Sequence, residues 1–387
     1  MKNIITGLDV GTAVISTVVA ERAKGEVAPR ILGIGKMPSQ GMRRGYVVDF
    51  DDVVAGIRAS VKEAERSAGV SIRRVYVSMG GISLGAFRSK GMIAVSRADG
   101  EITEYDVKRV LSQSEANLPN ITNREILHAI PLNFTIDNDL KTPRPVGMKG
   151  GRLEVETLFL ICLAQHLSDI IKSVEAAGLS VDDVVAAPLA AARAILTKRQ
   201  KEMGVLLVDV GAGTVSVVVF EEGIPISLEV FPIGSGHITN DIALGLQIPL
   251  EEAESLKLSY GSDASSRRKL TDIIEARLGD IFELVDAHLK KIKRTALLPA
   301  GIVLSGGGSN LVSIAEFAKN SLKLPVTIGY PNFLKENRVQ YREPDLAVAV
   351  GLCLLGFDED INPPIGGMAI ARRTKFALLR WLRSFLP

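Results

Sequence analysis

One pattern occurs twice in this chain and constrains its fold more than any other feature. Residues 4–20 and residues 205–220 each contain an apolar strand, the tripeptide Asp-Val-Gly, small residues with a Thr, and a second β-branched strand. Two hairpins of one design, about half a chain apart, predict a duplicated, two-domain body. A length of 387 residues, more than one compact core usually holds, agrees with this division. Two unrelated hairpins with glycine turns are the alternative.

The region between the hairpins predicts a long helix and one separate unit. Residues 51–70 have helical periodicity, and Gly69 is a suitable stop. Residues 84–162 have the order β-α-β-β, with a helix whose start carries Thr103 and Asp106 as capping residues. This order predicts a small α+β unit inserted into the first half. The apolar side of the helix at 51–70 consists of Val53, Val54, Ile57, Val61 and Ala64.

Three glycine-rich turns carry the candidate chemistry: GLDVGTA at 7–13, VDVGAGT at 208–214 and SGGGS at 305–309. None is a Walker loop. Their glycines nevertheless let backbone N–H groups approach phosphate oxygens closely, and Thr adds a hydroxyl donor. Asp9 and Asp209, one in each half, could hold a hydrated Mg²⁺ between them. The candidate nucleotide-contacting residues in these turns are Gly11, Thr12, Ala13, Gly211, Ala212, Gly213, Thr214, Gly306, Gly307, Gly308 and Ser309.

Together with the duplication, these turns resemble the phosphate-1, phosphate-2 and adenosine motifs of the actin/sugar-kinase/heat-shock-chaperone superfamily. Residues 41–81, 145–164 and 233–261 resemble, almost phrase by phrase, the FtsA family of cell-division actin homologues. The resemblance implies an α/β, two-domain actin-like fold of duplicated ribonuclease-H-like halves, with an inserted small α+β subdomain and a C-terminal amphipathic helix. It also implies that Glu254 and Lys257 embrace the ribose and adenine of ATP. An ordinary exposed Glu/Lys pair is the alternative.

The same resemblance implies a division of the chain into units. These are a first actin-like domain at residues 1–83 and 163–200, the inserted subdomain at 84–162, a second actin-like domain at 201–233 and 299–356, a helical nucleotide-clamping and partner-binding subdomain at 234–298, a flexible linker at 357–367, and the amphipathic helix at 368–387.

Four positions depart from the family pattern. Ala212 replaces the middle one of three glycines, Ser216 stands where an acidic residue often follows, and Val14 stands where Lys is frequent. Ala187 precedes the proline of the first connecting helix, where related ATPases often carry a Glu that positions the attacking water. A methyl group neither orients nor deprotonates water, a loss typically of roughly 10²–10⁴-fold. We therefore assign no catalytic residue and expect tight nucleotide binding with slow or negligible hydrolysis, at most a weak ATPase.

The C-terminal residues 368–387 contain five basic residues and no acidic one. Wound as a helix, they place the large apolar side chains on one face and most of the charge on the other. Such a helix is typical of an interfacial anchor on anionic lipid. A terminal helix docked on the protein's own core is the alternative, which the Pro/Gly-rich stretch before it disfavours. The predicted membrane-binding residues are Phe376, Leu378, Leu379, Trp381, Leu382, Phe385, Leu386, Arg373, Lys375, Arg380 and Arg383.

Composition indicates which kinds of partner and cellular location are unsuited to this chain. A net charge of +2 gives no overall field that would attract nucleic acid. Cys162 and Cys353 lie in apolar runs, which predicts buried, reduced thiols. The N-terminal residues do not read as a signal peptide, and no stretch reaches ~18 apolar residues, so we expect the chain to stay on the cytoplasmic side.

The family resemblance implies a filament-forming adaptor that binds ATP and Mg²⁺. It would bind the C-terminal tail of the tubulin-like division protein FtsZ at about residues 234–300, tether the FtsZ ring to the cytoplasmic face of the cell membrane at the division site, and help recruit later division membrane proteins. Two other classes stay open. An actin-like pilus-assembly adaptor generally lacks the C-terminal helix, and a small-molecule kinase of the superfamily would have no use for that helix.

Overall fold

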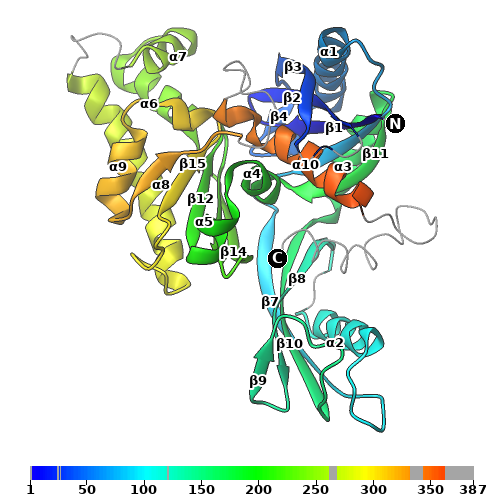
Figure 1. The fold of residues 1–387 in the computed structure, drawn as a ribbon. Helices are drawn as coiled ribbons and strands as arrows, with labels where there is room; N and C mark the ends of the chain where they lie inside the picture. Colours follow the sequence, from blue (N-terminus) through cyan, green and yellow to red (C-terminus); the bar gives the residue numbers. More distant parts are fainter. Residues whose placement is uncertain are drawn as a thin grey trace.

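The computed structural model describes residues 2–23, 26, 28–119, 122–260, 268–331 and 343–361. Its body has two halves, each built on a five-stranded mixed sheet (Figure 1). The first sheet has the order β3 (Arg30–Pro38), β2 (Val14–Ala23), β1 (Lys2–Val10), β6 (Arg74–Met79) and β11 (Ser180–Ala186). The second has the order β14 (Ile224–Phe231), β13 (Val215–Glu221), β12 (Val205–Val210), β15 (Ile302–Ser305) and β16 (Val326–Ile328).

The two sheets have the same connectivity and the same strand directions. In each, three consecutive strands pair antiparallel, β1–β2–β3 in one and β12–β13–β14 in the other. Two parallel strands then extend the sheet from the opposite side of the first strand. The Asp-Val-Gly turns therefore follow the central strand of each sheet. The predicted duplication is confirmed, and with it the two-domain α/β fold with an inserted α+β unit.

Helices pack on both sheets. The first sheet carries α1 (Phe50–Ala68) and α3 (Ala164–Ala176). The second carries α6 (Ser235–Leu246), α8 (Arg268–Lys291) and α9 (Ile314–Leu322), and α7 (Leu250–Leu258) packs on α6. The helix predicted at 51–70 is α1, whose five predicted apolar residues are all buried. The Asp49 carboxylate caps it by accepting from the Asp52 N–H, and Gly69 ends it in the left-handed conformation with φ 68°.

Between the two halves lie α4 (Ala187–Ile195) and α10 (Ala347–Ile361), which cross where both carry small residues. A Cβ at Gly351 would lie 1.8 Å from the carbonyl oxygen of Ala190, so the two helix backbones meet directly. A Cβ at Gly7 on β1 would lie 2.2 Å from the carbonyl oxygen of Ala349. These close approaches seat α10 against the first sheet. A short helix, α5 (Lys198–Met203), spans the predicted boundary at residue 200.

The inserted unit is an antiparallel sheet with α2 (Glu104–Ala116) packed on it, and it projects away from the two halves (Figure 1). The strand order is β7 (Gly85–Ala94), β10 (Arg152–Leu163), β8 (Arg124–Ile136) and β9 (Leu140–Thr142). Gly91 allows α2 to lie close on β7, because a Cβ there would be 2.2 Å from the Val110 carbonyl oxygen. The Arg88 guanidinium donates to the Ile226 carbonyl at 2.7 Å and joins this unit to strand β14 of the second half.

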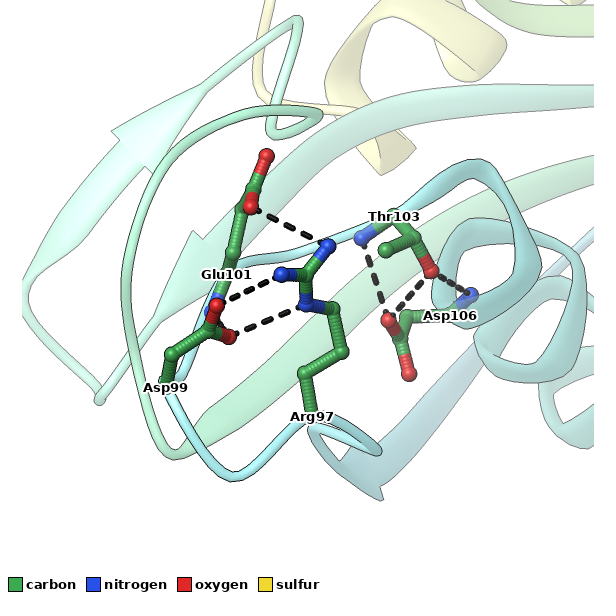
Figure 2. Close-up of polar contacts among 5 residues, drawn as sticks. All are labelled: Arg97, Asp99, Glu101, Thr103 and Asp106. Carbon is green, nitrogen blue, oxygen red and sulfur yellow. Dashed lines mark hydrogen bonds and ion pairs between the residues drawn. The ribbon is translucent and has the colours of Figure 1, made fainter.

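The start of α2 has the capping arrangement that the sequence predicts. The Asp106 carboxylate accepts from the Thr103 N–H at 3.0 Å and from its hydroxyl at 2.7 Å, and the Asp106 N–H points back to the Thr103 hydroxyl (Figure 2). Burial by itself would raise the pKa of Asp106, but its hydrogen bonds with Thr103 and Ser96 lower the pKa to about 2. Beside the cap, Arg97 pairs with Asp99 and Glu101 (Figure 2). The cap thus holds a buried, ionised carboxylate.

The C-terminal part differs from the sequence prediction at one point. The linker was predicted to begin at residue 357, but α10 continues to Ile361, and Phe357 is only 1% exposed. The first helix-breaking residues, Pro363 and Pro364, come later, which explains the extension. The rest of the linker and the terminal helix at 368–387 lie outside the described residues. Among the residues that the structure describes, no helix is long and apolar enough to span a membrane. Cys162 and Cys353 are buried and unpaired by disulfides, as predicted.

Candidate functional site

The two Asp-Val-Gly hairpins have the same turn geometry. In the first, the Gly11 N–H donates to the Val14 carbonyl at 3.1 Å; in the second, the Gly211 N–H donates to the Thr214 carbonyl at 2.9 Å. A Cβ at Gly11 would lie 2.6 Å from that Val14 oxygen, so the first turn requires glycine at this position. The repeated sequence therefore folds into the same tight turn in both halves.

The two turns meet at the interface of the halves. A Cβ at Gly213 would lie 3.0 Å from the Thr12 methyl and 3.4 Å from the Arg44 Cα. Arg44 lies in the turn between two short strands, β4 (Met42–Arg43) and β5 (Tyr46–Val47). A cavity of about 980 Å³ opens beside these turns, between the two halves. Such a volume is large enough for a ligand the size of a nucleotide.

Two carboxylates face this cavity, one from the end of the central strand of each sheet. The Ser78 hydroxyl, on β6, donates to Asp9 Oδ1 at 2.6 Å. Ser305, on β15, holds the equivalent place in the second half, in register with Asp209. Burial raises the pKa of Asp9 to about 6. Burial and the negative charge of Asp9 raise the pKa of Asp209 to about 7, against a smaller opposite effect of Ser305. The duplication thus extends to the partners of the carboxylates.

Two mutually repelling carboxylates in one cavity favour a cation between them. Among the described residues, no group of three or more His, Cys, Asp or Glu side chains is arranged to hold a metal ion. An ion held by Asp9 and Asp209 would therefore keep other ligands. Mg²⁺ fits this donor set, because it retains water and takes its remaining oxygens from a nucleotide.

The third glycine-rich turn closes the cavity from the second half. Gly306 has φ +79°, and a Cβ there would lie 2.4 Å from Asp209 Oδ1. A Cβ at Gly308 would lie 2.5 Å from Val210 Cγ1, whereas one at Gly307 would meet open space. The turn leads into a short 3₁₀ helix, η1 (Gly307–Asn310). The Ser309 hydroxyl donates to the Gly306 carbonyl at 2.7 Å and fixes the turn from within.

Glu254 and Lys257 lie on α7 at the cavity wall and are joined to each other. Lys257 Nζ lies 2.7 Å from Glu254 Oε2 and donates to the Thr239 hydroxyl at 3.0 Å, and that hydroxyl donates to Glu254 at 2.5 Å. Burial alone would raise the pKa of Glu254, but the hydrogen bonds from Lys257 and Thr239 hold it below its usual range. The pair therefore presents a charged, hydrogen-bonded edge that can accept and donate to a sugar or a base.

The opposite part of the wall carries little that could activate water. Ala187, at the start of α4, contributes only a methyl group. His166 accepts from the Ser83 hydroxyl at Nδ1, at 2.6 Å, and donates from Nε2 to the Gly45 carbonyl. Burial lowers the pKa of His166, which keeps the ring neutral at physiological pH. With both ring nitrogens engaged, this histidine is not free to act as a base.

The structure brings most of the predicted site residues to one cavity. Gly213 and Ser309 do not line it and instead shape the turns, while the other predicted nucleotide and metal residues do line it. Sequence reasoning missed Ser78, His166 and Asp345, which also line the cavity. Ser78 lies near the end of a predicted strand that runs into Gly80 and Gly81, and this strand-to-glycine pattern could have marked it as a site residue. His166 and Asp345 have no comparable signal, since only the folded chain brings them here.

Solved structures with the same arrangement define the class of protein. A structure of the PilM–PilN type IV pilus biogenesis complex matches with a TM-score of 0.68 and 19% identity, covering 91% of this chain and 98% of the other. MreB5 of Spiroplasma citri bound to ADP matches with a TM-score of 0.55 and 11% identity, covering 94% and 99%. At these identities the likeness shows the fold alone. The chain therefore has an actin-like fold.

Sequence relatives give the family. The profile for the cell division protein FtsA matches residues 206–351, and the profile for the SHS2 domain inserted in FtsA matches residues 81–161. The cell division protein FtsA of Pseudomonas aeruginosa is 33% identical over 379 residues, which cover 92% of this chain and 89% of that protein. This chain belongs to the FtsA family of cell division proteins, as its sequence motifs indicate.

Proposed function

We propose that this protein is an ATP-binding, filament-forming adaptor that tethers the FtsZ division ring to the cytoplasmic face of the cell membrane and helps recruit later division membrane proteins. The observation that carries the nucleotide part is the pair of equivalent hairpins, which present Asp9 and Asp209 to one cavity of about 980 Å³. Membership of the FtsA family supports the role in division.

The cavity suits ATP with Mg²⁺. The hairpin turns at Gly11 and Gly211 offer backbone N–H groups and Thr hydroxyls for phosphates, which bind such turns readily. Glu254 and Lys257 lie at the wall suited to the ribose and base. When bound, Mg²⁺ would supply positive charge between the phosphates and the carboxylates. The ADP in the related MreB5 fold supports the assignment of the cavity to a nucleotide.

Hydrolysis of this nucleotide should be slow. Ala187 lines the cavity without a polar group, and His166 is neutral and engaged at both ring nitrogens. A positioned general base usually contributes roughly 10²–10⁴-fold to such a reaction. The bound nucleotide then serves mainly to hold the two halves together around shared ligands, with at most weak turnover.

Membrane attachment is assigned to residues 368–387 on sequence grounds. Their apolar residues, with Trp381 and Phe385 among them, and their five cations suit the boundary of an anionic bilayer. One such helix binds reversibly, whereas many helices on one filament bind far more firmly through avidity. Self-assembly of the actin-like body would therefore strengthen the attachment of the protein to the membrane.

The FtsZ tail is assigned to the helical subdomain that contains α6, α7 and α8. Arg268 and Lys269 begin α8 and are exposed, so they offer positive charge to an acidic peptide. A peptide of the FtsZ tail, titrated by fluorescence anisotropy against the full chain, tests the partner directly. No binding at physiological salt would refute this assignment.

A liposome experiment tests the adaptor as a whole. The full chain, a chain ending at residue 367, and the variants Trp381→Glu and Ser384→Glu are sedimented with anionic vesicles, with and without Mg²⁺-ATP. We expect loss of binding in the truncated chain and a much larger loss for Trp381→Glu than for Ser384→Glu, which adds the same charge to the polar face. Filaments on the vesicles, seen by electron microscopy with Mg²⁺-ATP, test self-assembly. Equal binding of the truncated and full chains would refute the anchor.

A further inference from the structure

A short turn near the cavity is held by both halves of the molecule. It comprises Glu343 and the 3₁₀ helix η3 (Pro344–Leu346), directly before α10. From the second half, the Gly306 N–H and the Ser305 hydroxyl reach the Pro344 carbonyl at 3.3 and 3.2 Å. This fixes one side of the turn to the third glycine-rich loop.

From the first half, Lys36 holds the other side of the same turn. Its Nζ lies 2.8 Å from Asp345 Oδ2 and also pairs with the Glu343 carboxylate. Lys36 is on β3, the edge strand of the first sheet. Burial by itself would lower the pKa of Lys36, but the two carboxylates raise it above its ordinary value. The ammonium therefore stays charged and joins the halves next to the cavity.

The second oxygen of Asp345 lacks a partner. Asp345 lines the cavity, its Oδ1 is shielded from solvent, and it accepts no hydrogen bond from any side chain or backbone group that the structure describes. The carboxylate is close enough to Asp9 for its charge to raise the pKa of Asp9. Because this oxygen faces the cavity and has no protein donor among the described residues, it is free to accept a hydrogen bond from a ligand or from the water shell of an ion. A hydrated cation between Asp9 and Asp209 would bring donors to this place.

We propose that Asp345 is a third acidic residue of the cation site, acting through the water shell of the ion, and that Lys36 positions it from the opposite half. This rests on the proposed binding of a nucleotide with Mg²⁺. Lys36 has a physical reason to be there. Three free carboxylates in one cavity would repel each other and the phosphates. The Lys36 ammonium offsets the charge of Asp345 and holds the Asp345 side chain in place. Cation binding is thereby coupled to the contact between the halves.

The test compares nucleotide affinity with and without the cation. A fluorescent, non-hydrolysable ATP analogue is titrated into the full chain with Mg²⁺ and, separately, with EDTA. The ratio of the two dissociation constants measures the contribution of the cation. Asp345→Asn should lower this ratio on the order of tenfold, because its charge attracts the cation and repels bare phosphates. In EDTA the same variant should bind the analogue at least as tightly as the unmodified chain.

A matched control separates this effect from the loss of any ion pair. Asp241→Asn removes a carboxylate of nearly the same exposure, 28% against 29% for Asp345, which pairs with Arg277 and does not line the cavity. This control should keep the original ratio. Melting temperatures without nucleotide establish that all variants are folded, and Mn²⁺ titrations followed by electron paramagnetic resonance give a second measure of cation affinity.

The outcomes are distinct. An unchanged ratio in Asp345→Asn overturns the proposal. Lys36→Met removes the positioning contact together with a positive charge that opposes the cation. A ratio that falls in spite of this gain in net negative charge supports the positioning role of Lys36, whereas a ratio that stays the same or rises while Asp345→Asn lowers it refutes that role. If no variant and not even the unmodified chain binds the analogue under either condition, the proposed nucleotide function fails first.

Discussion

Replacing Asp209 with Asn should make the nucleotide-free protein more stable at neutral pH, although it removes a residue of the proposed site. The pKa of Asp209 rises from an ordinary value of 3.8 to about 7 in the folded chain. The folded state therefore binds this proton more tightly than the unfolded state. Stability then falls as the pH rises from about 4 to about 7, because the folded chain must give up a proton that it holds strongly.

The size of the effect follows from the same values. A pKa raised from 3.8 to about 7 corresponds to at most about 4 kcal/mol of unfolding free energy above pH 7. Because Asp209 is partly open to the cavity, solvent weakens the effect, and we expect roughly 2 kcal/mol. For a protein of this size that raises the melting temperature by about 2–3 °C. Below pH 4 both states are protonated and the gain should vanish.

Thermal melts from pH 4 to pH 8, without nucleotide or divalent ions, measure this gain. Asp209→Asn should diverge upward from the unmodified chain as the pH increases. The control Asp241→Asn removes an ion-paired carboxylate and should show no such divergence. If the curves of Asp209→Asn and the unmodified chain run parallel across the range, burial and the charge of Asp9 do not raise the pKa of Asp209, and the electrostatic reasoning about the cavity is wrong.

Three further outcomes are expected. Gly351→Ala should abolish stable folding, because its Cβ would lie 1.8 Å from a backbone oxygen. Gly307→Ala should fold normally and bind nucleotide more weakly, because its methyl group would enter the cavity. Urea melts measure the first effect and nucleotide titrations the second. Burial raises the pKa of both Cys162 and Cys353 to about 12, so neither thiol should react with a maleimide until the protein is unfolded. Purified protein with Mg²⁺-ATP should turn over no more than about once per minute, and a phosphate-release assay showing rapid turnover without a partner would contradict the inert wall around Ala187.

The parts of the fold that could be predicted are those in which local sequence decides the structure. The repeated hairpins, the Thr103 cap and the stop at Gly69 depend on a few neighbouring residues, and the structure has all three. The placement of α10 could not be read in this way. It depends on Gly7, which is far away in sequence and lets α10 lie on β1. A contact between a glycine and the backbone of a helix far along the chain leaves no pattern in either segment.

The candidate site shows the same limit. Asp9 and Asp209 stand in recognisable turns, so their meeting follows from the duplication. Asp345 and Lys36 are far apart in the chain, neither lies in one of the three glycine-rich turns, and only the fold brings them together at 2.8 Å. The partners of His166, which take both ring nitrogens, also come from other segments. Sequence motifs therefore identify the groups that contact a ligand more readily than the groups that position them.

The crossing of α4 and α10 has a mechanical consequence. Helices usually resist rotation against each other because large side chains of one lie in the grooves of the other. Here the point of closest approach is Gly351 against the Ala190 backbone, so no side chain separates the two helices at that point. α10 rests on the first sheet, while α4 contacts strands of both. This close crossing is therefore a place about which one half could turn against the other, and a ligand held by carboxylates from both halves would set the angle at which that turning stops.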